Sequence, residues 1–186
     1  MYKELDEQAL AKYCSQKDKM AEDELYRRYA VSVYTLCKRY LGDEEEAKDT
    51  MLDSLVQALE KIETYRYMGE GSLGRWVRTI AINKALAQIR KRRWRILPLD
   101  GWVQDHIPEP TEEEMETIPG EKLQEWIAEL PELRRAVFNL YCLDGYSHQD
   151  IGKMLGISER GSTSTLAKAR KQLKEKIKQY LKEQDR

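Results

Sequence analysis

The prolines of this 186-residue chain are gathered in one short segment, and this limits the fold more than any other feature. Four of the five prolines lie between Ile96 and Glu121, and the fifth is Pro131. Because proline disrupts a helix interior, the stretches on either side can form long unbroken helices. The composition, 41% hydrophobic and 35% charged, suits a helix-rich protein. We therefore predict an all-α fold with two small helical domains, residues 1–95 and 122–186, joined by a linker at 96–121.

Apolar residues recur at helical spacing on both sides of this linker. Residues 65–74 hold three glycines and no periodicity, so we expect a loop there. Gly42 is placed to end a helix, and Ser158 is placed to begin the last one. Ser147 and Asp150 fit a capping box. The predicted helices cover residues 4–16, 21–41, 44–63 and 73–93 in the first domain, and 122–130, 131–143, 147–155 and 158–183 in the second.

Charge is segregated along the chain although the formal net charge is only −1. Residues 75–95 carry 8 basic and no acidic side chains, and residues 160–182 carry 8 basic and 1 acidic. Between them, residues 96–121 carry 8 acidic side chains and no Lys or Arg. Each basic block alone is consistent with a solvated helix face. Two such blocks, with an acidic one between them, favour two contacts with a polyanion.

Several classes of protein do not fit the sequence. It has no run of 18 apolar residues, and its polar, acidic N-terminus does not resemble a secretory signal, so we expect no membrane insertion. Cys14, Cys37 and Cys142 form no C-x-x-C pair and are expected to be buried free thiols in a reducing cytoplasm. His106 and His148 lie far from any Cys, which argues against a zinc site. No phosphate-binding loop, metalloprotease motif or nucleophile–base set occurs, so we predict neither an enzyme nor a cofactor.

The C-terminal segment has the pattern of a helix-turn-helix. The sequence "SHQDIGKMLGIS" predicts a short helix, a turn at Gly156 and a longer cationic helix after Ser158. In such motifs the N-terminal residues of the second helix face base edges, while later cations meet phosphates. An ordinary antiparallel helical hairpin is the alternative.

The sequence resembles a known family in both halves. "GYSHQDIGKMLGIS" followed by "STLAKARKQL" is similar to the last helix-turn-helix of the extracytoplasmic-function (ECF) sigma factors. These are small two-domain bacterial specificity subunits of RNA polymerase. "DELYRRYAVSVYTLCKRYLGDEEEAKD" and "SLGRWVRTIAINKALAQIRKRR" resemble the opening helices and the strand-binding helix of the same family. The resemblance spans nearly the whole chain, in the right order.

The resemblance implies roles for the first domain. The helix at residues 44–63 would contact the polymerase clamp through Lys48, Asp49, Leu52, Asp53 and Gln57. The loop and the helix after it would hold the unpaired promoter strand, by base stacking and phosphate contacts. Trp76 is either domain core or also an edge of that site. The predicted strand-binding residues are Tyr65, Arg66, Tyr67, Trp76, Arg78, Asn83, Lys84, Arg90, Lys91, Arg92 and Arg93.

In the second domain the resemblance implies that the last helix reads duplex DNA. This helix departs from the family pattern at "RGSTSTLAKAR", where Gly161, Ser162, Thr163 and Thr165 replace the commoner residues, so the DNA sequence it reads cannot be carried over. Leu52 likewise stands where the family commonly has Gln. The predicted contacts are Ser158, Arg160, Thr163, Ser164, Ala167, Lys168, Arg170 and Lys171.

We therefore predict a cytoplasmic sigma factor that binds core RNA polymerase and promoter DNA and opens the duplex, with an anti-sigma factor as a further partner. The acidic linker would either mimic nucleic acid inside the polymerase or act as a spacer that discourages isolated DNA binding. Two other functions stay open: a stand-alone helix-turn-helix regulator, and a sigma-like module that sequesters an anti-sigma factor.

Overall fold

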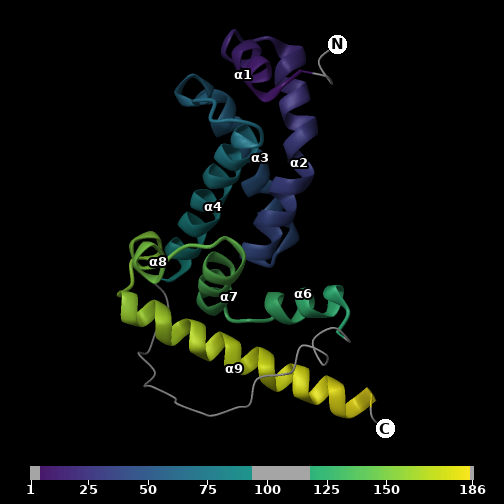
Figure 1. Cartoon of the computed structure of the whole chain (residues 1–186), viewed down its shortest axis with the longest axis vertical. Coiled ribbons are helices and arrows are strands. Elements are labelled where there is room, and N and C mark those ends of the chain that lie inside the picture. The colour runs from purple at the N-terminus through teal and green to yellow at the C-terminus, as the bar shows by residue number, and fades with distance from the viewer. Residues whose placement is uncertain (1–4, 94–117, 185–186) are drawn as a thin grey trace. The chain divides into compact units, whose positions relative to one another are not determined.

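The computed structural model describes residues 5–93 and 118–184, and within these ranges the chain forms helices and no strand (Figure 1). It divides into two compact units, residues 1–88 and 89–186. The linker prediction falls almost entirely on residues 94–117, outside the described ranges. No helix among the described residues is both long and apolar enough to cross a membrane.

The first unit begins with three helices, each started by an aspartate. They are α1 (Glu7–Ser15), α2 (Lys19–Leu41) and α3 (Glu44–Glu60). Asp6, Asp18 and Asp43 accept hydrogen bonds from main-chain amides of the first turns that follow them. α2 and α3 pack side by side over much of their length, and α1 packs on α2 (Figure 1).

A short 3₁₀ turn, η2 (Ile62–Thr64), and a loop at residues 65–71 lead into α4 (Ser72–Arg93). One side of α4 is buried, including Leu73, Val77, Ala81, Leu86 and Ile89. Charged side chains such as Arg75 and Arg78 are exposed. The prediction of helices separated by a glycine-containing loop is therefore confirmed, although α4 already begins at Ser72, two residues before Gly74.

The second unit contains α6 (Gly120–Ala128), α7 (Glu132–Phe138), α8 (His148–Leu155) and α9 (Glu159–Gln184). The helix predicted over residues 131–143 is not uniformly α-helical, because α7 ends in a π-helical turn, η3 (Asn139–Leu143). Both α7 and α8 pack on α9. At 1.5 Å per residue, the 26 residues of α9 extend over about 39 Å, and α9 is the longest of the four α-helices of this unit named here.

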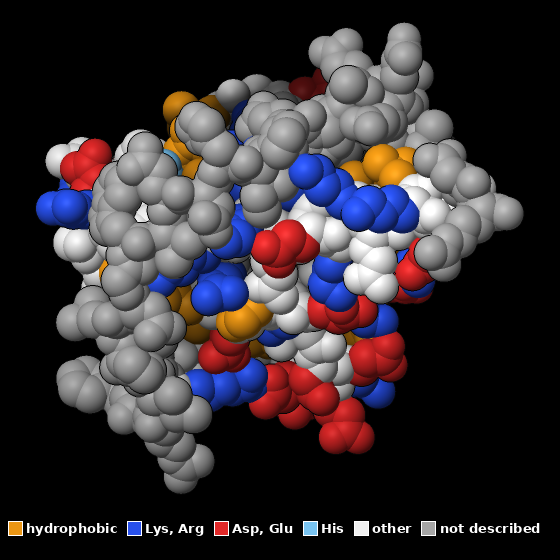
Figure 2. Space-filling model, turned by 90° about the horizontal axis from the view of Figure 1, so that it is seen from below, with side chains coloured by type: hydrophobic (Ala, Val, Ile, Leu, Met, Phe, Trp, Pro, Cys, Tyr) orange, Lys and Arg blue, Asp and Glu red, His pale blue; other side chains and the backbone are white. Residues whose placement is uncertain are grey.

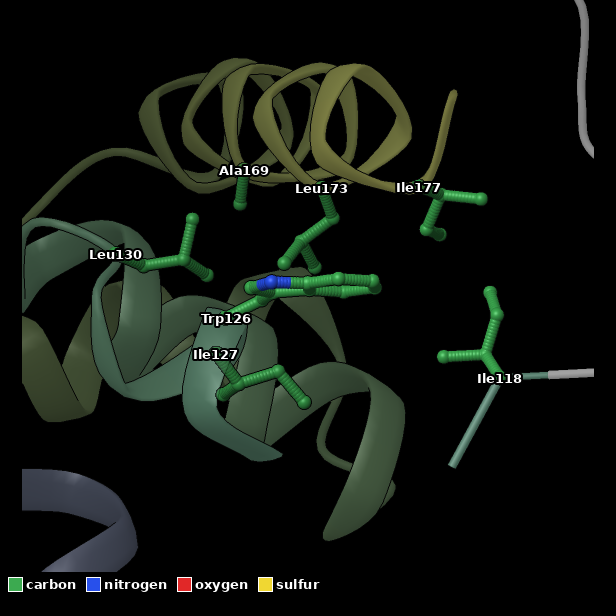
Figure 3. Packing of buried hydrophobic residues seen from close by; sticks show 7 residues of the cluster. All are labelled: Ile118, Trp126, Ile127, Leu130, Ala169, Leu173 and Ile177. Carbon is green, nitrogen blue, oxygen red and sulfur yellow. The ribbon is translucent and has the colours of Figure 1, made fainter. Parts of the chain in front are cut away.

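The core between α6 and α9 is centred on Trp126. Its ring lies below Leu173 and Ala169 of α9 and beside Leu130 and Ile127 of its own segment (Figure 3). Burial of a Leu or Ile side chain such as Leu130 or Ile127 contributes about 1.5–3 kcal/mol to stability through the hydrophobic effect. Close to this core, the buried guanidinium of Arg135 donates to the carbonyl of Ala128, 2.5 Å away, at the end of α6. Burial lowers the pKa of Arg135.

The expectation of three buried thiols is wrong for one of them. Cys14 and Cys37 are buried, and burial raises the pKa of these thiols to about 11 and about 12. Cys142 is exposed because η3 carries it on the surface of the second unit. Helical phase was the available signal, because Cys142 lies two residues after the buried Leu140 and five after the buried Val137, which places it on the other side of the helix.

Candidate nucleic-acid interface

The loop at residues 65–71 is held by one serine at the start of α4. The hydroxyl of Ser72 lies 2.6 Å from that of Tyr65 and accepts the amide of Met68 at 3.2 Å. The Tyr65 ring is buried and lies 5.6 Å from the Trp76 ring, centroid to centroid. Tyr65 is therefore not placed to stack on a base, contrary to the prediction, because its ring packs inward and its hydroxyl anchors the loop.

The exposed side chains of the loop lie at its tip and not at Tyr65. Tyr67 is 45% exposed and Met68 is 81% exposed. Arg66 is exposed while its guanidinium donates to the carbonyls of Glu63 and Tyr65. The loop thus offers one aromatic face, one flexible apolar side chain and one cation. Met68 was not among the predicted residues, because its position in the loop was the only signal in the sequence.

One face of α4 continues from this loop. Thr79, Asn83 and Arg90 follow one another at intervals of four and seven residues, so they share a face, and all three are exposed. The Lys84 ammonium lies 3.8 Å from the Asp53 carboxylate of α3. Trp76 is half-buried, which agrees with a core position that also reaches the surface. Of the other predicted residues, Arg78 and Lys91 are exposed, Arg92 is half-buried, and the side chain of Arg93 is outside the described residues.

The predicted polymerase-contacting residues share the exposed side of α3. Lys48, Asp49, Leu52 and Asp53 are all exposed, and Gln57 is half-buried. Leu52 is 41% exposed, and Val56, one turn further on, is 55% exposed. The helix therefore presents an apolar pair with charged neighbours. Val56 was missed, although its four-residue spacing from Leu52 indicated it.

The second unit has the geometry of a helix-turn-helix. Ser147 caps α8 by accepting the amide of Asp150 at 3.1 Å, and its hydroxyl donates to the Asp150 carboxylate. Gly156 ends α8 in the left-handed conformation, with φ 65°. A Cβ at Gly152 would lie 2.8 Å from the carbonyl oxygen of Ile157, so only glycine allows this close approach. Ser158 then accepts the amide of Gly161 at 3.0 Å and begins α9.

The exposed face of α9 brings together most of the predicted duplex-reading residues. Arg160, Ser164, Ala167 and Lys171 are four, three and four residues apart and lie opposite the buried face formed by Leu166, Ala169 and Leu173. Arg160 and Ala167 are exposed, and Ser164 and Lys171 are half-buried. The remaining members of this surface are Thr163, which is exposed, and Lys168, which is half-buried.

Two side chains of α9, those of Arg170 and Ser162, do not belong to this surface. The Arg170 guanidinium lies over the ring of Tyr141, 5.8 Å from its centroid, and so points toward η3. Ser162 is buried, and its hydroxyl lies 2.9 Å from the His148 ring nitrogen Nδ1. Ser162 therefore joins α8 to α9, which its helical phase with Leu166 and Ala169 indicated.

Lys and Arg side chains gather in groups beside groups of Asp and Glu on the face drawn in Figure 2. The near-neutral formal charge thus hides strong local differences. In the part of the chain that the structure describes, no three His, Cys, Asp or Glu side chains are close enough to hold a metal ion.

Comparison with known families matches both units. The family model for sigma-70 region 2 matches residues 25–95, and that for sigma-70 region 4 matches residues 120–173. The chain belongs to the ECF sigma factors. Together the two matched regions include the loop, α4 and the helix-turn-helix described above.

Curated relatives of this ECF sigma factor come from several bacteria. The ECF RNA polymerase sigma factor SigE of Mycolicibacterium smegmatis is 28% identical over 85% of the chain, which spans 62% of that protein's length. RNA polymerase sigma factor YlaC of Bacillus subtilis is 27% identical, with 83% of this chain and 91% of YlaC covered. The ECF RNA polymerase sigma-E factor of Haemophilus influenzae is 28% identical, with 95% and 98% covered.

A solved structure of sigma factor RpoE in complex with the anti-sigma factor NepR, from Bartonella quintana, has the same fold. Its TM-score is 0.51 at 19% identity, and 82% of this chain and 94% of the RpoE chain are covered. The prediction of an all-α sigma-factor fold is therefore confirmed.

Proposed function

We propose that this ECF sigma factor directs core RNA polymerase to promoters and opens the duplex there, acting in the cytoplasm by binding and not by catalysis. The observation that carries the proposal is the presence of sigma-70 regions 2 and 4 on one chain, in that order. Residues 1–95 would form the polymerase-binding and strand-opening domain and residues 96–117 the linker. The duplex-reading domain would be residues 118–186, because α6 begins at Gly120 and Ile118 is part of the core between α6 and α9.

The exposed apolar pair Leu52 and Val56 on α3 supports a protein contact. Exposed apolar side chains surrounded by charged ones are typical of protein interfaces. We assign this face, with Lys48, Asp49, Asp53 and Gln57, to core RNA polymerase. An anti-sigma factor is proposed as a second partner.

The loop tip and α4 support a contact with single-stranded DNA. Tyr67 supplies the stacking surface, and Asn83 supplies a donor and an acceptor for a base edge. Arg66, Arg78, Lys84, Arg90 and the cations that follow it supply phosphate contacts. Tyr65 is not part of this contact, because it is buried.

The exposed face of α9 supports a contact with duplex DNA. Ser164 and Thr163 bring hydroxyls that bond to several bases, while Arg160, Lys168 and Lys171 bring charge. Because the first domain and the polymerase bind at the same time, a modest affinity of α9 alone is sufficient.

One experiment separates this function from the two alternatives. Purified protein is mixed with core polymerase and genomic DNA fragments, and the run-off transcripts are sequenced. The proposal expects start sites that share a two-part upstream motif and that require both proteins. Promoter binding without polymerase would instead identify a stand-alone regulator. A failure to assemble with core polymerase would rule out the sigma function and favour a module that only binds an anti-sigma factor.

A further inference from the structure

A side chain near the N-terminus of the chain accepts hydrogen bonds from the first turn of α4. Helix N-termini leave main-chain amides without helical partners. Here the Glu7 carboxylate, on α1, accepts the amide of Leu73 at 3.0 Å through Oε2 and that of Gly74 at 3.3 Å through Oε1. The neighbouring amides of Ser72 and Arg75 donate to the loop carbonyls of Gly69 and Gly71. Glu7 therefore completes the hydrogen bonding of this turn.

Tyr29 holds the Glu7 carboxylate in this position. Its hydroxyl donates to Oε1 at 3.0 Å, and the pKa of Tyr29 is raised, first by burial and then by this bond. A Cβ at position 74 would lie only 3.2 Å from the Tyr29 ring. Glycine at that position thus lets α4 approach both partners, and three helices meet at one carboxylate.

The anchored turn carries the loop that presents Tyr67 and Met68. Ser72 binds the loop from inside, through Tyr65 and the amide of Met68. The next two residues, Leu73 and Gly74, are the ones that Glu7 binds. The position of the loop relative to α1 and α2 therefore depends on a charge-assisted contact more than sixty residues distant in sequence.

We propose that Glu7 is a positioning residue for promoter opening, which fixes the loop at residues 65–71 in the conformation that receives the unpaired strand. The inference rests on the proposed function. Glu7 does not touch DNA in this account. Its substitution should slow strand opening while leaving the initial binding of duplex DNA by α9 intact, because α9 belongs to the other unit.

The test uses the full chain in Glu7→Gln and Tyr29→Phe forms, with two controls. Gln8→Ala alters the exposed neighbour of Glu7 on α1, and Ile82→Val removes one buried methyl group from α4, more than two turns beyond Gly74. Amide hydrogen exchange at Leu73 and Gly74 in the free protein reports the anchor itself. We expect exchange about tenfold faster in Glu7→Gln, as for the loss of one hydrogen bond to a charged group, and no change in Gln8→Ala.

Opening is then measured with core polymerase on a promoter recovered from the run-off experiment, by the fluorescence of 2-aminopurine in the non-template strand. We expect an opening rate about tenfold lower for Glu7→Gln and a smaller reduction for Tyr29→Phe, with closed-complex affinity within about twofold of the unaltered protein. Ile82→Val should open normally.

Normal opening by both the unaltered protein and Glu7→Gln would overturn this inference and leave the proposed function standing. So would an equal loss in Ile82→Val, since the effect would then follow stability alone. A failure of the unaltered protein to open any promoter would overturn the proposed function and this inference with it.

Discussion

The ammonium of Lys84 lies 3.8 Å from the carboxylate of Asp53 and connects α4 to α3. The exposed side of α4 is assigned to DNA and that of α3 to polymerase. This ion pair therefore lies between the two proposed binding surfaces. Both side chains are partly exposed, Lys84 at 34% and Asp53 at 67%. Exposed ion pairs of this kind contribute little to stability, and either partner can exchange the other for a phosphate or a protein group.

We predict that Lys84→Gln changes the free energy of unfolding by less than about 1 kcal/mol, because the ion pair is exposed. The logarithm of the promoter-binding constant falls linearly with the logarithm of the salt concentration. The same variant should make this slope less steep by about one, the value expected for one lost phosphate contact. Binding measured across a salt series checks this, with Lys12→Gln on the exposed side of α1 as the control. An unchanged slope would remove Lys84 from the DNA-binding surface.

Substitutions of Tyr67 and of Tyr65 should have different effects, although only Arg66 lies between them. Tyr67→Ala is expected to weaken binding to the unpaired strand by about 1–3 kcal/mol, the range measured for one stacked base, with little effect on thermal stability. Tyr26→Ala on α2 is a matched control, because Tyr26 is 46% exposed and Tyr67 is 45% exposed. Equal binding by the two variants would contradict the stacking role.

Tyr65→Phe should act through the loop instead. The substitution removes the 2.6 Å contact with Ser72 but keeps the buried ring beside Trp76. We expect a stability loss of about 1 kcal/mol, since one buried hydrogen bond is lost. Faster amide exchange at Met68 would accompany it. Unchanged exchange there would show that Tyr65 does not anchor the loop.

Glu24 should make the first unit sensitive to acid. Hydrogen bonds from Arg27 and then from Arg28 lower the pKa of its carboxyl from 4.5 to about 2. Because the folded-state pKa is the lower one, the stabilisation is fully present above about pH 4.5 and is lost as pH falls toward 2. Glu24→Gln should lower stability at neutral pH and flatten the stability profile across this window.

The control for Glu24 is Asp23→Asn, which alters the exposed neighbouring carboxylate on the same helix. Urea unfolding at several pH values between 2 and 7 measures both variants. If Glu24→Gln kept the full acid sensitivity of the unaltered protein, the Glu24 network would not be its source.

Gly152 and Gly156 should tolerate substitution very differently. Gly156→Asn places a residue that accepts the left-handed conformation into open space, so DNA binding should be retained. Gly152→Ala puts a methyl group 2.8 Å from a main-chain oxygen, which must push α9 away from α8. We expect a destabilisation of about 1–3 kcal/mol and a loss of duplex binding, measured by unfolding and by mobility shift. Full duplex binding by Gly152→Ala would contradict this account of the turn.

Local signals in the sequence were enough to predict most helix boundaries. Gly42 ends α2, and Ser147 and Ser158 accept the first amides of α8 and α9, as their positions indicated. Such caps act within a few residues, so they can be recognised without the fold. The exposed face of α9 also followed from its helical phase.

Features that depend on contacts between helices could not be predicted in this way. Tyr65 in a glycine-containing loop looks available, and only the packing around Ser72 and Trp76 buries it. Arg170 belongs by composition to the cationic helix, yet η3 brings Tyr141 beneath its guanidinium. The contact of Glu7 with Leu73 joins residues that no local pattern connects.

The proposed function requires that this protein opens promoter DNA only together with core polymerase. The most direct test is the fluorescence of 2-aminopurine placed in the non-template strand of a recovered promoter, with the protein and the polymerase added separately and together. We predict an increase, which reports unstacked bases, only when both are present, and a slower increase for Tyr67→Ala. An equal increase with either component alone, or none with both, would rule out the proposed function.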